Sequence, residues 1–140
     1  MTHAHAYVIK ADIKNFGLPS YVFLSQKTMY GGKKIVEGDT IFVFASENEG
    51  GQGLALRGIV QQATPVPHKV GIERQTPRVN VTVRSTGVAK RALGRAELRV
   101  FDSWNDGKPQ TELNFKFYRQ ATNKIGGISA EAAKFLSSHF

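Results

Sequence analysis

The chain contains no cysteine among its 140 residues. This absence excludes a disulfide framework, a zinc–thiolate site and a thiol nucleophile. No run of about 18 consecutive apolar residues occurs, so no membrane-spanning helix is expected. The first ten residues lack the charged start and the long apolar core of a signal peptide. Together these absences predict a soluble cytoplasmic protein without membrane partners.

Familiar catalytic motifs are also missing. Neither Gly-x-Ser-x-Gly nor His-Glu-x-x-His occurs, and the four histidines are scattered. Gly50-Gly51-Gln52-Gly53 lacks the Lys-Ser/Thr pair of a phosphate-binding loop, and we interpret it as a flexible hairpin tip. We therefore expect no enzyme, no metal site and no cofactor.

Positive charge, in contrast, is abundant and unevenly distributed. The formal net charge is +8, and residues 69–99 hold eight basic against two acidic residues, a net charge of +6. Six of these eight are arginines, whose planar guanidinium binds phosphate through two hydrogen bonds and stacks on bases. This basic stripe predicts a nucleic-acid partner, and a merely solvated basic face is the alternative. The predicted phosphate contacts are Arg119 and six residues of the stripe, namely Arg78, Arg84, Lys90, Arg91, Arg95 and Arg99.

Alternating apolar and polar residues predict strands through the first two thirds of the chain. Short strands are expected over 6–11 and 21–24, with a loop or a broken helical turn over 26–34. Two apolar runs, 40–46 and 54–62, flank a glycine-bearing loop and predict a hairpin. Residues 78–84 alternate strictly and place three valines on one face, as a barrel strand requires.

The last third is predicted to mix strands with helices. One or two helical turns are expected over 88–93, ended by Gly94. Alternation predicts strands over 96–104 and 113–118, the second ended by Gly126-Gly127. Ser129 is a predicted N-cap for a final helix that runs to about Ser137. The fold class predicted is α+β, mainly β: one domain over 1–140, formed by a small mixed β-barrel with short helices and a C-terminal helix.

About two thirds of the chain, most clearly residues 20–62, resembles the PUA-like superfamily, which includes the EVE and ASCH domains. Gly38-Asp39, followed by a strand that ends in Phe44-Ala45-Ser46, is similar to the EVE pattern, with Phe in place of the usual Tyr. The ASCH pattern Gly-x-Lys-x-x-Glu-x-Arg is not met, because the Glu is displaced and the Arg is missing after Gly32. The resemblance is therefore to EVE domains more than to ASCH domains. It implies a small barrel that binds RNA or modified nucleotides.

A base-binding pocket needs an aromatic face and polar groups that read the base edge. Trp104, the only tryptophan, lies where a predicted strand meets a turn and is well placed to stack, or else it caps the barrel. Phe44 and Ser46 would line the pocket by the resemblance to EVE domains. Tyr118 lies on the accessible face of its predicted strand, and Tyr30 lies in a glycine-rich loop with no evident core role.

Three functions remain open from the sequence. The first is a nucleic-acid-binding module that recognises RNA or a modified base, with the choice of RNA or DNA undecided. The second is a protein-interaction or small-ligand-binding module on the same barrel, with a protein partner in place of nucleic acid. The third is a ribonuclease of the ASCH kind.

Overall fold

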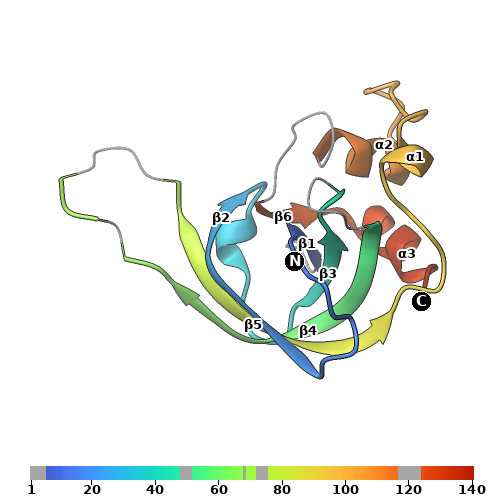
Figure 1. The fold of residues 1–140 in the computed structure, drawn as a ribbon. Helices are drawn as coiled ribbons and strands as arrows, with labels where there is room; N and C mark the ends of the chain where they lie inside the picture. The colour runs from blue at the N-terminus through green and yellow to red at the C-terminus, as the bar shows by residue number, and fades with distance from the viewer. Residues whose placement is uncertain (1–5, 48–51, 68, 72–75, 117–123) are drawn as a thin grey trace.

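Six strands close into a barrel in the order β1-β3-β4-β5-β2-β6 (Figure 1). The computed structural model describes residues 6–47, 52–67, 69–71, 76–116 and 124–140. The strands are β1 (Ala6–Ala11), β2 (Ser20–Met29), β3 (Thr40–Ala45), β4 (Gly53–Pro65), β5 (Arg78–Val88) and β6 (Ile125–Ile128). The helices are the 3-10 helix η1 (Gly32–Lys34) and the α-helices α1 (Arg95–Leu98), α2 (Pro109–Asn114) and α3 (Ala130–Ser137). The predicted small mixed barrel with a C-terminal helix is confirmed.

The barrel is mixed because two of its strand pairs are parallel. β1 pairs parallel with β3 and antiparallel with β6, whereas β2 pairs parallel with β6. Only two residue pairs, Thr28↔Ile125 and Met29↔Gly126, join β2 to β6. Gly32 lies against this closure, where an added Cβ would stand 2.2 Å from the Ile125 carbonyl oxygen. A glycine is therefore required at the point where the barrel closes.

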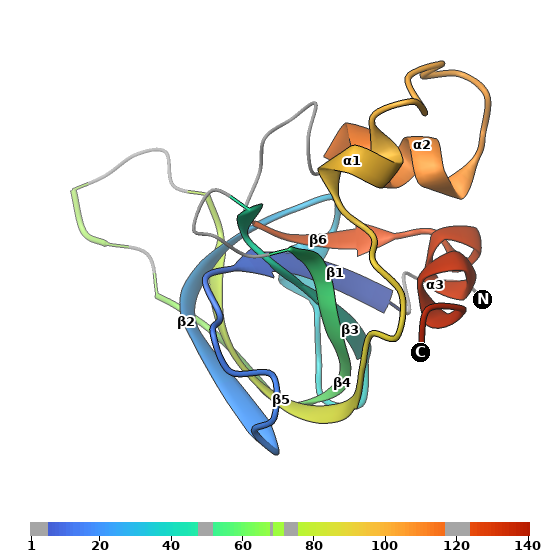
Figure 2. The same ribbon diagram turned by 45° about the vertical axis from the view of Figure 1, so that its right-hand side comes forward.

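Two apolar layers share the strands β1 and β3. Tyr7, Ile9 and Val43 belong to the core inside the barrel. Val8 and Phe42 belong to a second core, which also contains side chains from all three α-helices. Figure 2 shows these helices gathered on one side of the barrel. The parallel pair β1–β3 is thus buried on both faces, which explains the continuous apolar run in β3.

Several sequence predictions are confirmed. The hairpin over 40–62 is β3 and β4. On β5 the three valines at 79, 81 and 83 are buried, while Arg78 and Arg84 are exposed. Ser129 caps α3, because its Oγ accepts the backbone N–H of Ala132 at 3.1 Å. Local patterns were sufficient for these elements, since each is specified within a few residues.

The helix predicted over 88–93 is wrong, and so is the strand predicted over 96–104. β5 continues to Val88, and the following residues run without helix to Gly94. Gly94 begins α1 instead of ending a helix, because the Glu97 carboxylate accepts its backbone N–H at 2.6 Å. That contact is the second half of a capping box and favours a helical turn over extended backbone.

The strand predicted over 113–118 is also wrong within the described residues. Residues 109–114 form α2, which starts with Pro109 at a helix-compatible first position. Leu113 and Asn114 are both buried, which an alternating strand would not produce. Residues 117 and 118 lie outside the described part of the chain.

Two further elements differ from prediction. The strand predicted over 21–24 continues as β2 to Met29, where a loop was expected, and has an irregularity between Phe23 and Gln26. Gly126 and Gly127 lie inside β6 and do not terminate a strand. Both segments are extended because they pair with each other to close the barrel.

Candidate functional site

A polar cluster lies where β1 and β3 end together. These strands are parallel and in register, and the backbone N–H of Ser46 donates to the Ala11 carbonyl at 2.8 Å. Lys10 follows Ala6 and Val8 on the face that otherwise packs under the helices, and only 7% of it is exposed. A lysine therefore occupies the last position of an apolar face, at the same strand ends as Ser46.

Two more charged residues complete this group. The Glu47 carboxylate accepts the backbone N–H of Arg95 at 3.2 and 3.3 Å, which fastens the start of α1 to the end of β3. Gly94 permits this approach, because a Cβ there would lie 3.1 Å from a Glu47 carboxylate oxygen. We call Lys10, Ser46, Glu47 and Arg95 the strand-end cluster.

The electrostatics of Lys10 distinguish it from an ordinary surface lysine. Burial lowers the pKa of its ammonium, the nearby Arg95 lowers it further, and Glu47 opposes the shift. A buried cation is costly unless it is paired or used. Buried ionisable groups with shifted pKa values are common at functional sites, so the buried Lys10 marks the strand ends as a candidate site.

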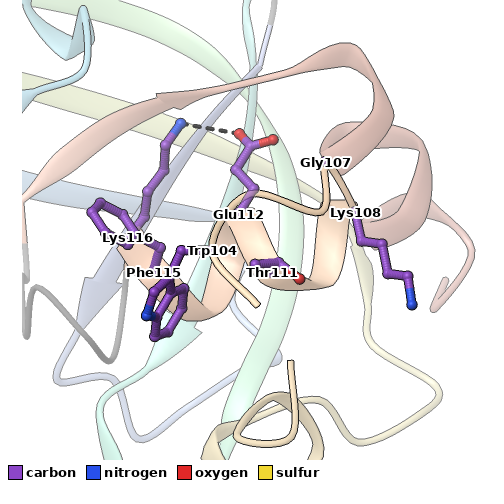
Figure 3. A pocket seen from close by; sticks show the side chains of 7 residues that line it. All are labelled: Trp104, Gly107, Lys108, Thr111, Glu112, Phe115 and Lys116. Atoms are coloured by element: carbon purple, nitrogen blue, oxygen red, sulfur yellow. Dashed lines mark hydrogen bonds and ion pairs between the residues drawn. The ribbon is translucent and has the colours of Figure 1, made fainter. Parts of the chain in front are cut away.

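A second candidate site is a cavity of about 300 Å³ on α2 (Figure 3). Trp104 meets Phe115 edge to face, with ring centroids 5.6 Å apart, and 38% of the tryptophan is exposed. The pair forms an aromatic wall at one end of the cavity. The lining residues are Trp104, Gly107, Lys108, Thr111, Glu112, Phe115 and Lys116. We call this cavity the Trp104 pocket.

Two of the charged residues in this pocket hold the fold together. Glu112 accepts the Ser129 hydroxyl at 2.5 Å and backbone N–H at 2.9 Å, and it pairs with Lys116 at 3.0 Å. Burial raises the pKa of Glu112, but the hydrogen bonds from Ser129 and Lys116 outweigh it and leave a lowered pKa. Lys116 also donates to the Gly127 carbonyl at 2.6 Å. These contacts tie α2 to β6 and to the start of α3.

Tyr30 lies beside this tie. The ammonium of Lys116 stands 4.7 Å from the centroid of the Tyr30 ring. The backbone of Tyr30 is left-handed, with φ 51°, and its carbonyl accepts the N–H of Gly127 at 3.2 Å. A non-glycine residue in that region carries backbone strain, which commonly persists near functional sites. The structure thus brings Tyr30 to Lys116, at one edge of the Trp104 pocket.

The basic stripe does not form a single patch. β5 has eleven residues and spans roughly 35 Å, with Arg78 at its first position and Lys90 just beyond its last. Arg78 donates to the Ser25 carbonyl at 2.8 Å, and Arg84 is exposed in mid-strand. Arg91 binds the carbonyl and the hydroxyl of Ser138 after α3. Arg95 belongs to the strand-end cluster, so the basic residues that flank it in the sequence, within 90–99, are the ones associated with this site.

Of the residues that the sequence predicted for a base pocket, the described lining of the Trp104 pocket includes Trp104 itself. Ser46 is half-buried at the end of β3, whereas the described lining of the Trp104 pocket comes from residues 104–116. Phe44 is fully buried in the core beneath the helices. Tyr118 and Arg119 lie outside the described residues.

Two members of the strand-end cluster were missed from the sequence, Lys10 and Glu47. A signal for Lys10 was present, because it follows Ala6 and Val8 at spacing two and so continues an apolar face. That spacing acquires meaning only when both faces of β1 are known to be buried. Glu47 carries no comparable pattern, since its partner Arg95 is distant in the chain.

No family model matches the sequence, and no curated protein matches it either. Solved structures do match. Human THYN1 protein, in a complex with DNA that contains 5-methylcytosine, is 16% identical over 96% of both chains, with a TM-score of 0.64. The DUF55 domain of human thymocyte nuclear protein 1 is 15% identical over 95% of this chain and 96% of that chain, with a TM-score of 0.66. A Pseudomonas syringae protein is 15% identical over 96% of this chain and 99% of its own, with a TM-score of 0.60.

The fold is PUA-like, of the EVE type. This finding confirms the resemblance, which was clearest over 20–62, and extends it to nearly the whole chain. At these identities the likeness establishes the PUA-like fold alone, and the ligand of the human protein is a property of that protein.

Metal and membrane sites are not found in the part of the chain described. No three acidic or histidine side chains among the described residues come close enough to hold a metal ion. No helix within the described ranges is long and apolar enough to cross a membrane.

Proposed function

We propose that this PUA-like protein is a nucleic-acid-binding module that reads one base at the strand-end cluster. The observation that carries this proposal is the buried Lys10 at the shared end of two parallel strands. An ammonium offers three hydrogen-bond donors, whereas the Ser46 hydroxyl both donates and accepts. A base edge presents donors and acceptors side by side, so this pair is chemically complementary to it.

The basic residues around α1 suit the phosphates on either side of such a base. Arg95 belongs to the cluster, and Arg99 follows α1 on the exposed surface. Lys90 is also exposed, in the segment that leads from β5 to α1. Contacts to phosphate would set affinity and its salt dependence without selecting sequence, while Lys10 and Ser46 would supply the selection.

The comparisons support the choice of a first ligand. A human protein with the same PUA-like fold has been crystallised with DNA that contains 5-methylcytosine. We infer that a modified cytosine is the base to test first, and that DNA and RNA should be compared directly. The 2′-hydroxyl is the group through which a protein can tell them apart.

The test is fluorescence polarisation with a labelled duplex that carries one 5-methylcytosine. The unmodified duplex and an RNA of the same sequence are compared at two salt concentrations. Affinity should fall as salt rises, because bound phosphates release counterions. Lys10→Met should abolish the preference between modified and plain cytosine and leave the salt dependence intact.

Lys134→Met is the matched control, since this lysine is exposed on α3. It should bind with unchanged base preference. If the wild-type protein bound none of the three nucleic acids, the proposal would be wrong and a protein partner would take its place.

A further inference from the structure

We infer that the Trp104 pocket is a second nucleotide site, distinct from the strand-end cluster, that takes one unstacked base with its phosphate. The inference rests on the proposed function for the class of ligand. It depends on separate residues, because the described lining of the pocket includes no member of the strand-end cluster. The protein would therefore contact an unpaired strand at two points.

The aromatic wall supplies the stacking surface. Trp104 is held edge to face against Phe115 at 5.6 Å, so the indole is fixed by packing while 38% of it remains exposed. A flat and rigid aromatic surface binds any base through its π-face. The cavity volume of about 300 Å³ lies at the lower end of the range for small-ligand sites. A single base with its sugar is a ligand of that class.

The acidic groups around the pocket are already engaged. Asp106 accepts the backbone N–H of Lys108 at 2.9 Å and the hydroxyl of Thr111 at 3.0 Å, and the first of these bonds is the main cause of its lowered pKa. Glu112 is held by Ser129 and Lys116. The Glu112 charge is thus directed into the fold, and the exposed Asp106 carboxylate is held by donors of its own turn. An anionic ligand meets less repulsion than the count of carboxylates suggests.

One lysine is placed to bind the phosphate. Lys116 is committed to Glu112 and to the Gly127 carbonyl. Lys108 is exposed. Its ammonium stands 6.0 Å from the centroid of the Phe101 ring, and its charge also acts on Asp106, whose pKa it helps to lower. Figure 3 shows Lys108 at the opposite end of the pocket from the aromatic pair. A base on Trp104 would direct its phosphate toward Lys108.

The chain provides its own reporter for this site. Trp104 is the only tryptophan, so its emission reports the pocket directly. We would titrate the full chain with cytidine monophosphate, with a single-stranded oligonucleotide of about six nucleotides, and with the same strand containing abasic sites. Saturable quenching is expected with the first two and not with the abasic strand. The free nucleotide tests the pocket alone, and the strand tests the pocket within nucleic acid.

Two variants sharpen the test. Lys108→Glu lies on the surface and should weaken quenching by the oligonucleotide about tenfold. Lys134→Met, on the exposed surface of α3, should leave the quenching unchanged, because this residue belongs to neither site. Polarisation binding without any change in Trp104 emission would overturn the second site and leave the proposed function standing. Equal quenching by the abasic strand, or no effect of Lys108→Glu, would also overturn it.

The opposite outcome would contradict the strand-end proposal and leave the second site standing. If wild-type protein quenched normally but did not separate modified from plain cytosine, the strand-end proposal would fail and the Trp104 pocket would stand.

Discussion

Lys10 is the residue at which stability and function oppose each other most directly. Its ammonium is buried and its pKa is lowered, first by burial and then by Arg95. The folded protein therefore disfavours the charge that the proposed function uses. An apolar side chain of similar length would remove that cost.

We expect Lys10→Met to be at least as stable as the wild-type protein at neutral pH, while losing base preference. The lowered pKa also makes wild-type stability rise as the pH increases from the folded pKa of Lys10 toward its ordinary value of 10.5, because over that interval the unfolded chain holds a proton that the folded chain has released. The variant should lack this rise. Thermal unfolding measured at several pH values tests both statements. A variant much less stable than wild type at pH 7 would show that Lys10 is structural.

Gly58 is a residue whose small size the packing requires. A Cβ there would lie 2.4 Å from a methyl group of Val83 and 2.7 Å from the Arg84 carbonyl oxygen. We expect Gly58→Ala to lower the free energy of unfolding by about 1–3 kcal/mol, because neither the neighbouring strand nor the buried valine can move freely. Urea denaturation measures the loss.

Gly87→Ala is the matched control on the partner strand. Its Cβ would meet only the ring of Phe140, at an ordinary contact distance of 3.7 Å. This variant should unfold close to wild type. Similar losses from both substitutions would mean that backbone entropy, and not the close approach at Gly58, decides the result.

At the scale of elements, the Glu112 tie explains how two short helices hold together. α2 has six residues and α3 has eight, lengths at which helices depend on tertiary contacts. Glu112 joins them through Ser129, whose hydroxyl at the same time caps α3. The Glu112 carboxylate thus stabilises both α2, to which it belongs, and the start of α3.

We expect Glu112→Gln to cost about 1.5–3 kcal/mol at pH 7, the range for hydrogen bonds to a charged group. Because the folded pKa lies below the usual 4.5, the carboxylate stabilises the protein above that pH. This contribution is lost as pH falls through the folded pKa. Wild type should therefore lose more stability than the variant between pH 5 and the acid limit, in urea denaturation at each pH.

Glu131→Gln serves as the control, since this residue is exposed in the first turn of α3. It should follow the wild-type acid profile closely. An unchanged acid profile in Glu112→Gln would contradict the role assigned to the tie.

At the scale of the whole molecule, the geometry of β5 divides the positive charge. Arg78 and the basic residues after Val88 lie at opposite ends of a strand of eleven residues. Figure 1 shows the start of β5 in the part of the hairpin that extends away from the helices. A short nucleic acid bound at the strand-end cluster would therefore contact the basic residues after Val88 and would not reach Arg78.

We expect Arg99→Glu to weaken binding of a short oligonucleotide and to reduce the slope of log affinity against log salt by about 0.7–0.9. Arg78→Glu changes the net charge equally and should have a much smaller effect. Polarisation at four salt concentrations gives the slopes. Equal effects of the two substitutions would indicate that net charge alone attracts the nucleic acid.

Much of the fold was predictable from the sequence, because many elements are specified locally. Alternation over 78–84 fixed which face of β5 is buried, and Ser129 fixed the start of α3. Alternation was misleading over 96–104 and 113–118, where single buried leucines, Leu98 and Leu113, pack under the barrel. A short helical turn buries one such side chain as well as a strand does, so the local pattern could not separate them.

The sequence by itself determined the fold class, the PUA-like resemblance and the excess of positive charge. Only the tertiary structure showed which residues lie near one another. Lys10 and Arg95 are close because β1 and β3 end together and Glu47 fastens α1 to that end, and the described lining of the Trp104 pocket includes neither residue. Contacts between residues far apart in the chain depend on how the barrel closes, and no local pattern encodes that closure.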